Sequence, residues 1–214
     1  SGALLNVWND VRKMNGDIYY LLQTYGYSTD LDKSIFAPAR EGEIVLCLNY
    51  GGLYGINNIN HFLQESNSGK AIWRGIQRYK VGDPILFNDA SDKFFTRTED
   101  QLPVIHNNMT GRIVDFLLLN EGKATEGIQF DIEIDQPLID MDMKDMDFTI
   151  VGTADNGNSI IRFVVNKNKT TDEDDEGPSK ATVPFQIAYA VSIHKAQGLE
   201  YDHVKIIITD EIDE

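Results

Sequence analysis

Hydrophobic positions recur with two different spacings near the beginning of the chain. Residues 44–48 are five consecutive apolar residues, a run typical of a strand buried on both faces, as in a parallel sheet. After the glycine pair at 51–52, apolar residues recur at helical spacing up to residue 63. Strand, glycine turn and helix form the basic unit of an α/β nucleotide-binding domain. Upstream, residues 4–22 have the spacing of one or two short amphipathic helices.

The middle of the chain, from about residue 76 to residue 183, follows a strand pattern instead. Short apolar runs alternate there with turn signals such as Gly82-Asp83 and Asp155-Asn156-Gly157. The spacing predicts a small antiparallel β module that closes into a barrel. Its strands are expected within residues 84–87, 111–119, 129–134, 148–151 and 160–165.

The pattern of a parallel core returns near the end of the chain, at residues 187–191 and 204–208. Before it, residues 170–180 carry a run of Asp and Glu that repels itself, which we interpret as a solvated loop. The predicted fold class is therefore α/β. A parallel-sheet domain made of residues 1–75 and 185–214 receives residues 76–184 as an inserted β-rich module.

The overall charge argues against one class of function. A formal net charge of -15 and a pI of about 4.6 do not suit a protein that coats nucleic acid, because affinity for phosphates needs clustered Lys and Arg. A localised cationic groove on an acidic body is compatible with this composition. The single cysteine, Cys47, lies in the first apolar run and cannot form a disulfide framework or a cysteine-based zinc site.

No apolar segment approaches the roughly 20 residues that span a bilayer, and the N-terminus lacks the pattern of a secretion signal. We therefore expect a cytoplasmic protein with no membrane partner. The chain begins at Ser1 rather than at Met, which favours a segment of a longer protein.

Several residues with useful chemistry follow the strand predicted at 187–191. Ser192 and His194 stand where polar groups at a strand end can reach a ligand over the carboxyl edge of a sheet. Gly198 lets a backbone amide approach a ligand closely, and Glu200 can accept a hydrogen bond from a hydroxyl group. This combination suits contact with a phosphate backbone and a ribose at the same time. The chain has no Gly-x-x-x-x-Gly-Lys-Ser/Thr sequence, so we do not expect it to hydrolyse a nucleoside triphosphate by itself.

The same residues resemble a known family. Motif V of superfamily-1 helicases, written in that family as Thr-x-His-Lys-x-Gln-Gly-x-Glu-Phe/Tyr, is similar to the stretch Ser192-Ile193-His194-Lys195-Ala196-Gln197-Gly198-Leu199-Glu200-Tyr201. The pair Lys195 and Gln197 resembles the RecD-like branch more than the UvrD-like branch. Residues 45–60 resemble the region around motif IV. Residues 79–85 with 107–114 resemble the SH3-like barrel that these helicases insert before motif V.

The resemblance implies a fold, an activity and a set of roles. The fold is the second RecA-like motor domain, of P-loop NTPase type, with the SH3-like barrel inserted into it. The activity is that of an ATP-dependent DNA helicase, which couples ATP hydrolysis to translocation along a single strand and to unwinding. ATP and Mg²⁺ would be bound mainly by an N-terminal RecA-like domain of the same protein. The implied roles are DNA binding by Ser192, His194, Lys195 and Gln197, and nucleotide binding by Gly198 and Glu200.

The family pattern is incomplete, and this leaves alternatives open. Motif VI would lie beyond Glu214 and the Walker motifs before Ser1, so no complete catalytic set is expected in the chain. The main alternative is a non-catalytic nucleic-acid-binding or adaptor module with a helicase-like fold. A subunit of a helicase–nuclease complex is a third interpretation. RNA is left open as the strand in place of DNA.

Other residues have simpler interpretations. The four His are scattered without metal-ligand spacing, and the Asp-rich stretch at 140–147 lacks the glycine and the terminal Glu of a calcium loop, so no metal site is predicted. Trp8, Trp73, Phe94 and Phe95 are aromatic candidates for stacking on bases. Buried packing explains Trp8 better, whereas Phe94 and Phe95 stand beside cationic residues and suit an exposed loop.

Overall fold

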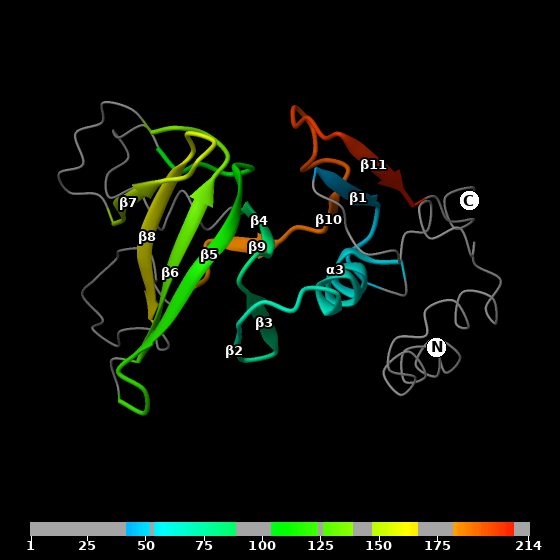
Figure 1. Cartoon of the computed structure of the whole chain (residues 1–214). Helices are drawn as coiled ribbons and strands as arrows, with labels where there is room; N and C mark the ends of the chain where they lie inside the picture. The colour runs from blue at the N-terminus through cyan, green and yellow to red at the C-terminus, as the bar shows by residue number, and fades with distance from the viewer. Residues whose placement is uncertain are drawn as a thin grey trace, which may run out of the picture. The chain divides into compact units, whose positions relative to one another are not determined.

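The chain divides into two compact units in a computed structural model that describes residues 42–51, 54–88, 104–123, 126–138, 147–166 and 182–207. One unit, the parallel unit, comprises Ser1–Asn67 and Tyr189–Glu214; the other, the antiparallel unit, comprises Ser68–Ala188. Figure 1 shows their elements. The helices predicted within residues 4–22 and the acidic loop predicted at 170–180 lie outside the described residues.

The parallel unit is built on a three-stranded sheet with the order β10-β1-β11. Strand β1 (Glu43–Cys47) is the apolar run near the start of the chain, and it pairs in parallel with β10 (Ala190–Ser192) and β11 (His203–Ile206). Helix α3 (Ile56–Glu65) follows β1 and lies beside the sheet (Figure 1). Its apolar stripe is buried, as are the side chains of β1 that face inward. The strand–turn–helix pattern thus predicts these local elements correctly.

Asn60 of α3 ties the helix to the outer edge of β10. Its amide group donates to the carbonyl oxygen of Ala190 at 2.9 Å and accepts the Ala190 amide at 2.7 Å. Because β10 has only β1 beside it among the described strands, its other edge would otherwise leave these backbone groups without a strand partner. Ala190 is fully buried, so water cannot reach its backbone groups, and Asn60 supplies their hydrogen bonds instead.

The antiparallel unit contains a larger sheet and a separate hairpin (Figure 1). The sheet has six strands, each antiparallel to its neighbours. Their order across the sheet is β7 (Thr149–Thr153), β8 (Ser159–Asn166), β6 (Gly127–Ile134), β5 (Thr110–Leu119), β4 (Pro84–Phe87) and β9 (Phe185–Ile187). The hairpin consists of β2 (Ala71–Arg74) and β3 (Gln77–Lys80).

Aromatic rings form the core of the antiparallel unit. Phe130 is fully buried, and its ring centroid lies 5.2 Å from that of Phe185, 5.5 Å from that of Tyr79 and 6.1 Å from that of Phe163. The first two contacts are edge-to-face, the arrangement that the charge distribution of aromatic rings favours. Burial raises the pKa of the Tyr79 hydroxyl to about 12. Tyr79 belongs to β3, so this core holds the hairpin in the antiparallel unit.

The predicted fold class is wrong. Among the described residues, 47% are in strands and 8% in helix, and the largest sheet is antiparallel, whereas a RecA-like α/β domain is rich in helices around a parallel sheet. The parallel strands contribute only five, three and four residues. Apolar runs indicate that a strand is buried without showing how many parallel neighbours it has. That number depends on pairing between distant segments.

The predicted SH3-like barrel is also wrong. The outer strands of the six-stranded sheet, β7 and β9, do not pair with each other in the described part of the chain, so the sheet stays open. Closure requires a consistent tilt and stagger of all strands, which the spacing of apolar runs does not contain. The antiparallel unit extends from Ser68 to Ala188, because the β2–β3 hairpin joins it through Tyr79.

The thiol of Cys47 is expected to be protected by the sheet of the parallel unit. The side chain is fully buried, and burial raises its pKa from 9.0 to about 11. At pH 8 the thiolate fraction alone would make the native thiol about 100-fold less reactive than the unfolded one. The measurement is the rate of labelling by a disulfide reagent in native buffer and in urea. Equal rates would contradict the buried position.

The raised pKa of Cys47 also makes the free energy of unfolding depend on pH. The pKa is higher in the folded state, so the stabilisation is fully present below about pH 9 and is lost as pH rises towards about 11, because the unfolded thiol ionises first. A Cys47→Ala variant removes this contribution, and its free energy of unfolding should therefore depend less on pH across that interval.

Candidate nucleic-acid and nucleotide site

The residues that carry the candidate site form a tight turn after β10. The chain turns through residues 193–198, here called the 193–198 turn, before it returns along β11. The carbonyl oxygen of Ser192 accepts the amides of Lys195 at 3.0 Å and Ala196 at 3.2 Å. The amide of Leu199 donates to Ala196 at 3.1 Å. Local hydrogen bonds therefore give the turn a defined shape.

Ser192 is the last residue of β10 and immediately precedes this turn. Its side chain is buried, and its hydroxyl oxygen accepts the Lys195 amide at 3.3 Å. Ser192 stands opposite Cys47 in the sheet, and the next amide, that of Ile193, donates to the Cys47 carbonyl oxygen. The structure thus places Ser192 where it links β1 to the turn. The sequence motif did not distinguish this internal position from a surface one.

The other predicted site residues are more accessible. His194, Gln197, Gly198 and Glu200 are exposed, and Lys195 is half-buried. All five follow β10 within eight residues of its end, so the structure brings the predicted set together on one segment. Because β1, β10 and β11 are parallel, this segment lies at the carboxyl edge of the sheet, the edge where α/β sheets bind ligands.

Gly198 has a backbone conformation that favours glycine. Its φ is +84°, and a Cβ atom built on it would have no neighbour within 4 Å. The glycine is thus required by its dihedral angle, and the space beside it is open to a ligand. Glu200 is two residues further on, with an exposed carboxylate that can accept hydrogen bonds.

The loop between β1 and α3 approaches the start of the helix very closely. A Cβ atom on Gly55 would lie 2.7 Å from the carbonyl oxygen of Tyr50, so only glycine fits. The amides of Ile56 and Asn57 donate to the carbonyl oxygens of Asn49 and Tyr50. Free amides at a helix start commonly bind phosphate, but these two already have partners within the chain.

Asn60 is a functional candidate that sequence reasoning missed. It holds β10 in position two residues before Ser192. A signal was present, because Asn60 is a polar residue within the apolar stripe formed by Ile56, Ile59 and Leu63. A polar side chain at such a position usually has a specific hydrogen-bond partner.

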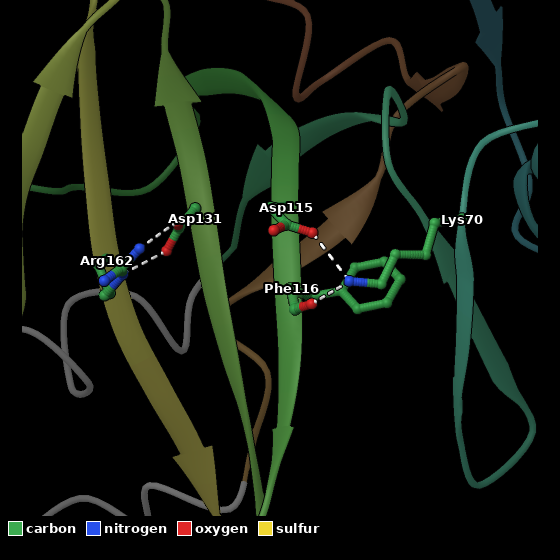
Figure 2. Close-up of polar contacts among 5 residues, drawn as sticks. All are labelled: Lys70, Asp115, Phe116, Asp131 and Arg162. Atoms are coloured by element: carbon green, nitrogen blue, oxygen red, sulfur yellow. Dashed lines mark hydrogen bonds and ion pairs between the residues drawn. The ribbon is translucent and has the colours of Figure 1, made fainter.

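Charged groups of the antiparallel unit are paired with one another (Figure 2). Arg162 of β8 donates to both carboxylate oxygens of Asp131 on β6, at 2.7 and 2.6 Å. Lys70 donates to the Asp115 carboxylate at 3.0 Å and to the carbonyl oxygen of Phe116 at 2.7 Å. The hydrogen bond from Lys70 lowers the pKa of Asp115. These cations are thus already engaged by the chain.

Across the ranges that the structure describes, no group of three or more His, Cys, Asp and Glu side chains is arranged to hold a metal ion. No helix in these ranges combines the length and the apolar composition needed to cross a lipid bilayer. Phe94 and Phe95, predicted to lie on an exposed loop, are outside the described residues, as is Trp8.

In comparisons with known proteins, neither a family model nor a curated sequence matches the chain. What the chain does is therefore inferred from the residues of the 193–198 turn and from their placement.

Proposed function

We propose that this chain is a segment of an ATP-dependent DNA helicase, and that its 193–198 turn couples ATP hydrolysis to movement along a single strand. The observation that carries the proposal is the motif-V-like sequence at the carboxyl edge of a parallel sheet. Residues of the turn can make these contacts at the end of a short parallel sheet, without a RecA-like fold around them.

The order of chemical groups along the turn supports coupling. His194 and Gln197 expose hydrogen-bond donors suited to a phosphate backbone, whereas Gly198 and Glu200 follow directly with an open backbone and a carboxylate. Hydrogen bonds within the turn keep these groups in a fixed relation. A shift caused by a nucleotide at one end of this segment would therefore move the strand contact at the other.

The residues present fit one side of a nucleotide site. The open space beside Gly198 admits a ligand against the backbone, and the Glu200 carboxylate can accept a hydrogen bond from a ribose hydroxyl. ATP and Mg²⁺ would be bound mainly by an N-terminal RecA-like domain of the same protein, which supplies the phosphate chemistry. Such a protein would act on single-stranded DNA in the cytoplasm.

A second candidate function is a non-catalytic nucleic-acid-binding or adaptor module. It is favoured by the predominance of antiparallel strands, which are not the framework of a motor domain. Strand-stimulated ATP hydrolysis by the full-length protein separates the two functions, because an adaptor has none.

Replacing His194 or Glu200 with alanine in the full-length protein tests the proposed coupling. Loss of a hydrogen bond to a charged partner typically costs about 1.5–3 kcal/mol, so we expect each variant to bind its ligand about 10-fold or more weakly. His194→Ala should raise the DNA concentration that gives half-maximal ATPase stimulation. Glu200→Ala should raise the KM for ATP.

Matched controls lie on the same chain. His203 is an exposed histidine on β11, outside the turn, and Glu121 is an exposed glutamate in the antiparallel unit. His203→Ala and Glu121→Ala should leave both quantities unchanged. Unchanged ATPase and unwinding in both test variants would refute the proposed roles.

A further inference from the structure

The β2–β3 hairpin of the antiparallel unit exposes two large apolar side chains. Trp73 is 57% exposed, and Ile76, at the tip, is 99% exposed. The hairpin turns at Gly75-Ile76, and Gly75 has a φ of +60°, as a two-residue hairpin loop requires of its first residue. Exposure of a tryptophan on an ordered strand is unusual, because burying its ring is favourable.

The two faces of the hairpin have different surroundings. On one face, Tyr79 points into the aromatic core. On the same face, Arg74, the cross-strand partner of Gln77, donates to the carbonyl oxygen of Asn166 at 2.7 Å. Trp73 and Arg78 are direct cross-strand partners and share the opposite face. This outward face is therefore the one that is available to a partner.

Arg78 orients the exposed ring. Its guanidinium carbon lies 5.5 Å from the centroid of the Trp73 ring, within the range of a cation–π interaction. One side of the indole is thus supported by a cation. A flat aromatic ring held in place beside a positive charge suits a partner that combines planar groups with negative charge.

The charge of the hairpin segment also suits a negatively charged partner. Residues 66–82 contain Lys70, Arg74, Arg78 and Lys80 but no Asp or Glu, although the whole chain has a formal net charge of -15. Lys70 and Arg74 make hydrogen bonds within the unit. Arg78 lies against the Trp73 ring.

We propose that the outward face of the β2–β3 hairpin binds single-stranded nucleic acid, with a base stacked on Trp73 and the backbone phosphate beside Arg78. Single strands fit because their bases are free to stack on an aromatic ring, whereas the bases of a duplex are already stacked on each other. The positive segment favours a polyanion over an apolar protein surface. This site is separate from the 193–198 turn and does not depend on the proposed function.

The full chain with Trp8→Phe provides a direct test, because Trp73 is then its only tryptophan. Titration with an oligothymidylate at low ionic strength should quench the Trp73 fluorescence, and a duplex of equal length should quench it less. Trp73→Ala should weaken binding of a labelled oligothymidylate by about 5–100-fold, whereas Trp73→Phe, which keeps a ring, should retain most of the affinity.

A charge-matched pair of variants separates the hairpin from general electrostatics. Arg78→Glu should weaken binding more than Arg112→Glu, which makes the same charge change at an exposed position of β5. Equal effects of these two variants would overturn the proposal, as would undiminished binding by Trp73→Ala or equal quenching by the duplex. His194→Ala should leave the quenching of Trp73 intact, so that failure of the proposed coupling turn and failure of this site give different results.

Discussion

Replacing Phe130 with alanine is expected to lower the free energy of unfolding of the antiparallel unit by about 3–5 kcal/mol. The ring is fully buried and contacts the rings of Tyr79, Phe163 and Phe185. Those three residues come from β3, β8 and β9. The cavity left by the substitution would therefore weaken contacts between strands that are distant in sequence. The loss therefore combines hydrophobic transfer energy with weakened contacts between strands.

Urea unfolding followed by circular dichroism measures this loss, and amide hydrogen exchange of β6 assigns it to the antiparallel unit. Leu117→Ala is the matched control, because Leu117 is on the neighbouring strand β5 but is 54% exposed. It should change the free energy of unfolding by less than about 0.5 kcal/mol. Similar losses in the two variants would contradict the assignment of Phe130 to the centre of the core.

Replacing Asn60 with alanine is expected to destabilise the edge of the parallel sheet by about 2 kcal/mol or more, because it leaves two buried polar groups unsatisfied and each costs about 1–3 kcal/mol. The substitution leaves both the amide and the carbonyl oxygen of Ala190 without their partner on α3. It therefore loosens β10 immediately before Ser192. If the proposed coupling is correct, Asn60→Ala also weakens DNA stimulation of ATP hydrolysis without removing any contacting side chain.

The single cysteine reports on this edge. Cys47 lies on β1 opposite Ser192, so its reaction with a thiol reagent requires the sheet to open. Asn60→Ala should increase the labelling rate roughly 30-fold or more when opening is in rapid equilibrium. Asn57→Ala, the same substitution at an exposed position of α3, should leave the rate unchanged. An unchanged rate in Asn60→Ala would mean that the two hydrogen bonds do not stabilise the edge.

The candidate site and the fold depend on the sequence in different ways. The glycine at 198 and the polar residues around it lie on one segment after β10, because neighbours in sequence must remain neighbours in space. The internal position of Ser192 was not predicted, since it depends on how the turn closes on its own hydrogen bonds. Trp73 was recognised as an aromatic candidate, but its outward direction depends on pairing with Arg78.

By itself, the sequence determined most of the described strands and the helix, although not β2 and β3 of the hairpin. It also determined where the chain is acidic and which residues form the motif that resembles a helicase. These properties depend on spacing and composition within short windows, and β1 and α3 follow them closely. Only the tertiary structure decided that the middle segment forms an open antiparallel sheet, that Asn60 holds β10, and that the hairpin presents Trp73 outward. Each of these depends on contacts between residues far apart in the chain, whose strength comes from burial and pairing rather than from local preference.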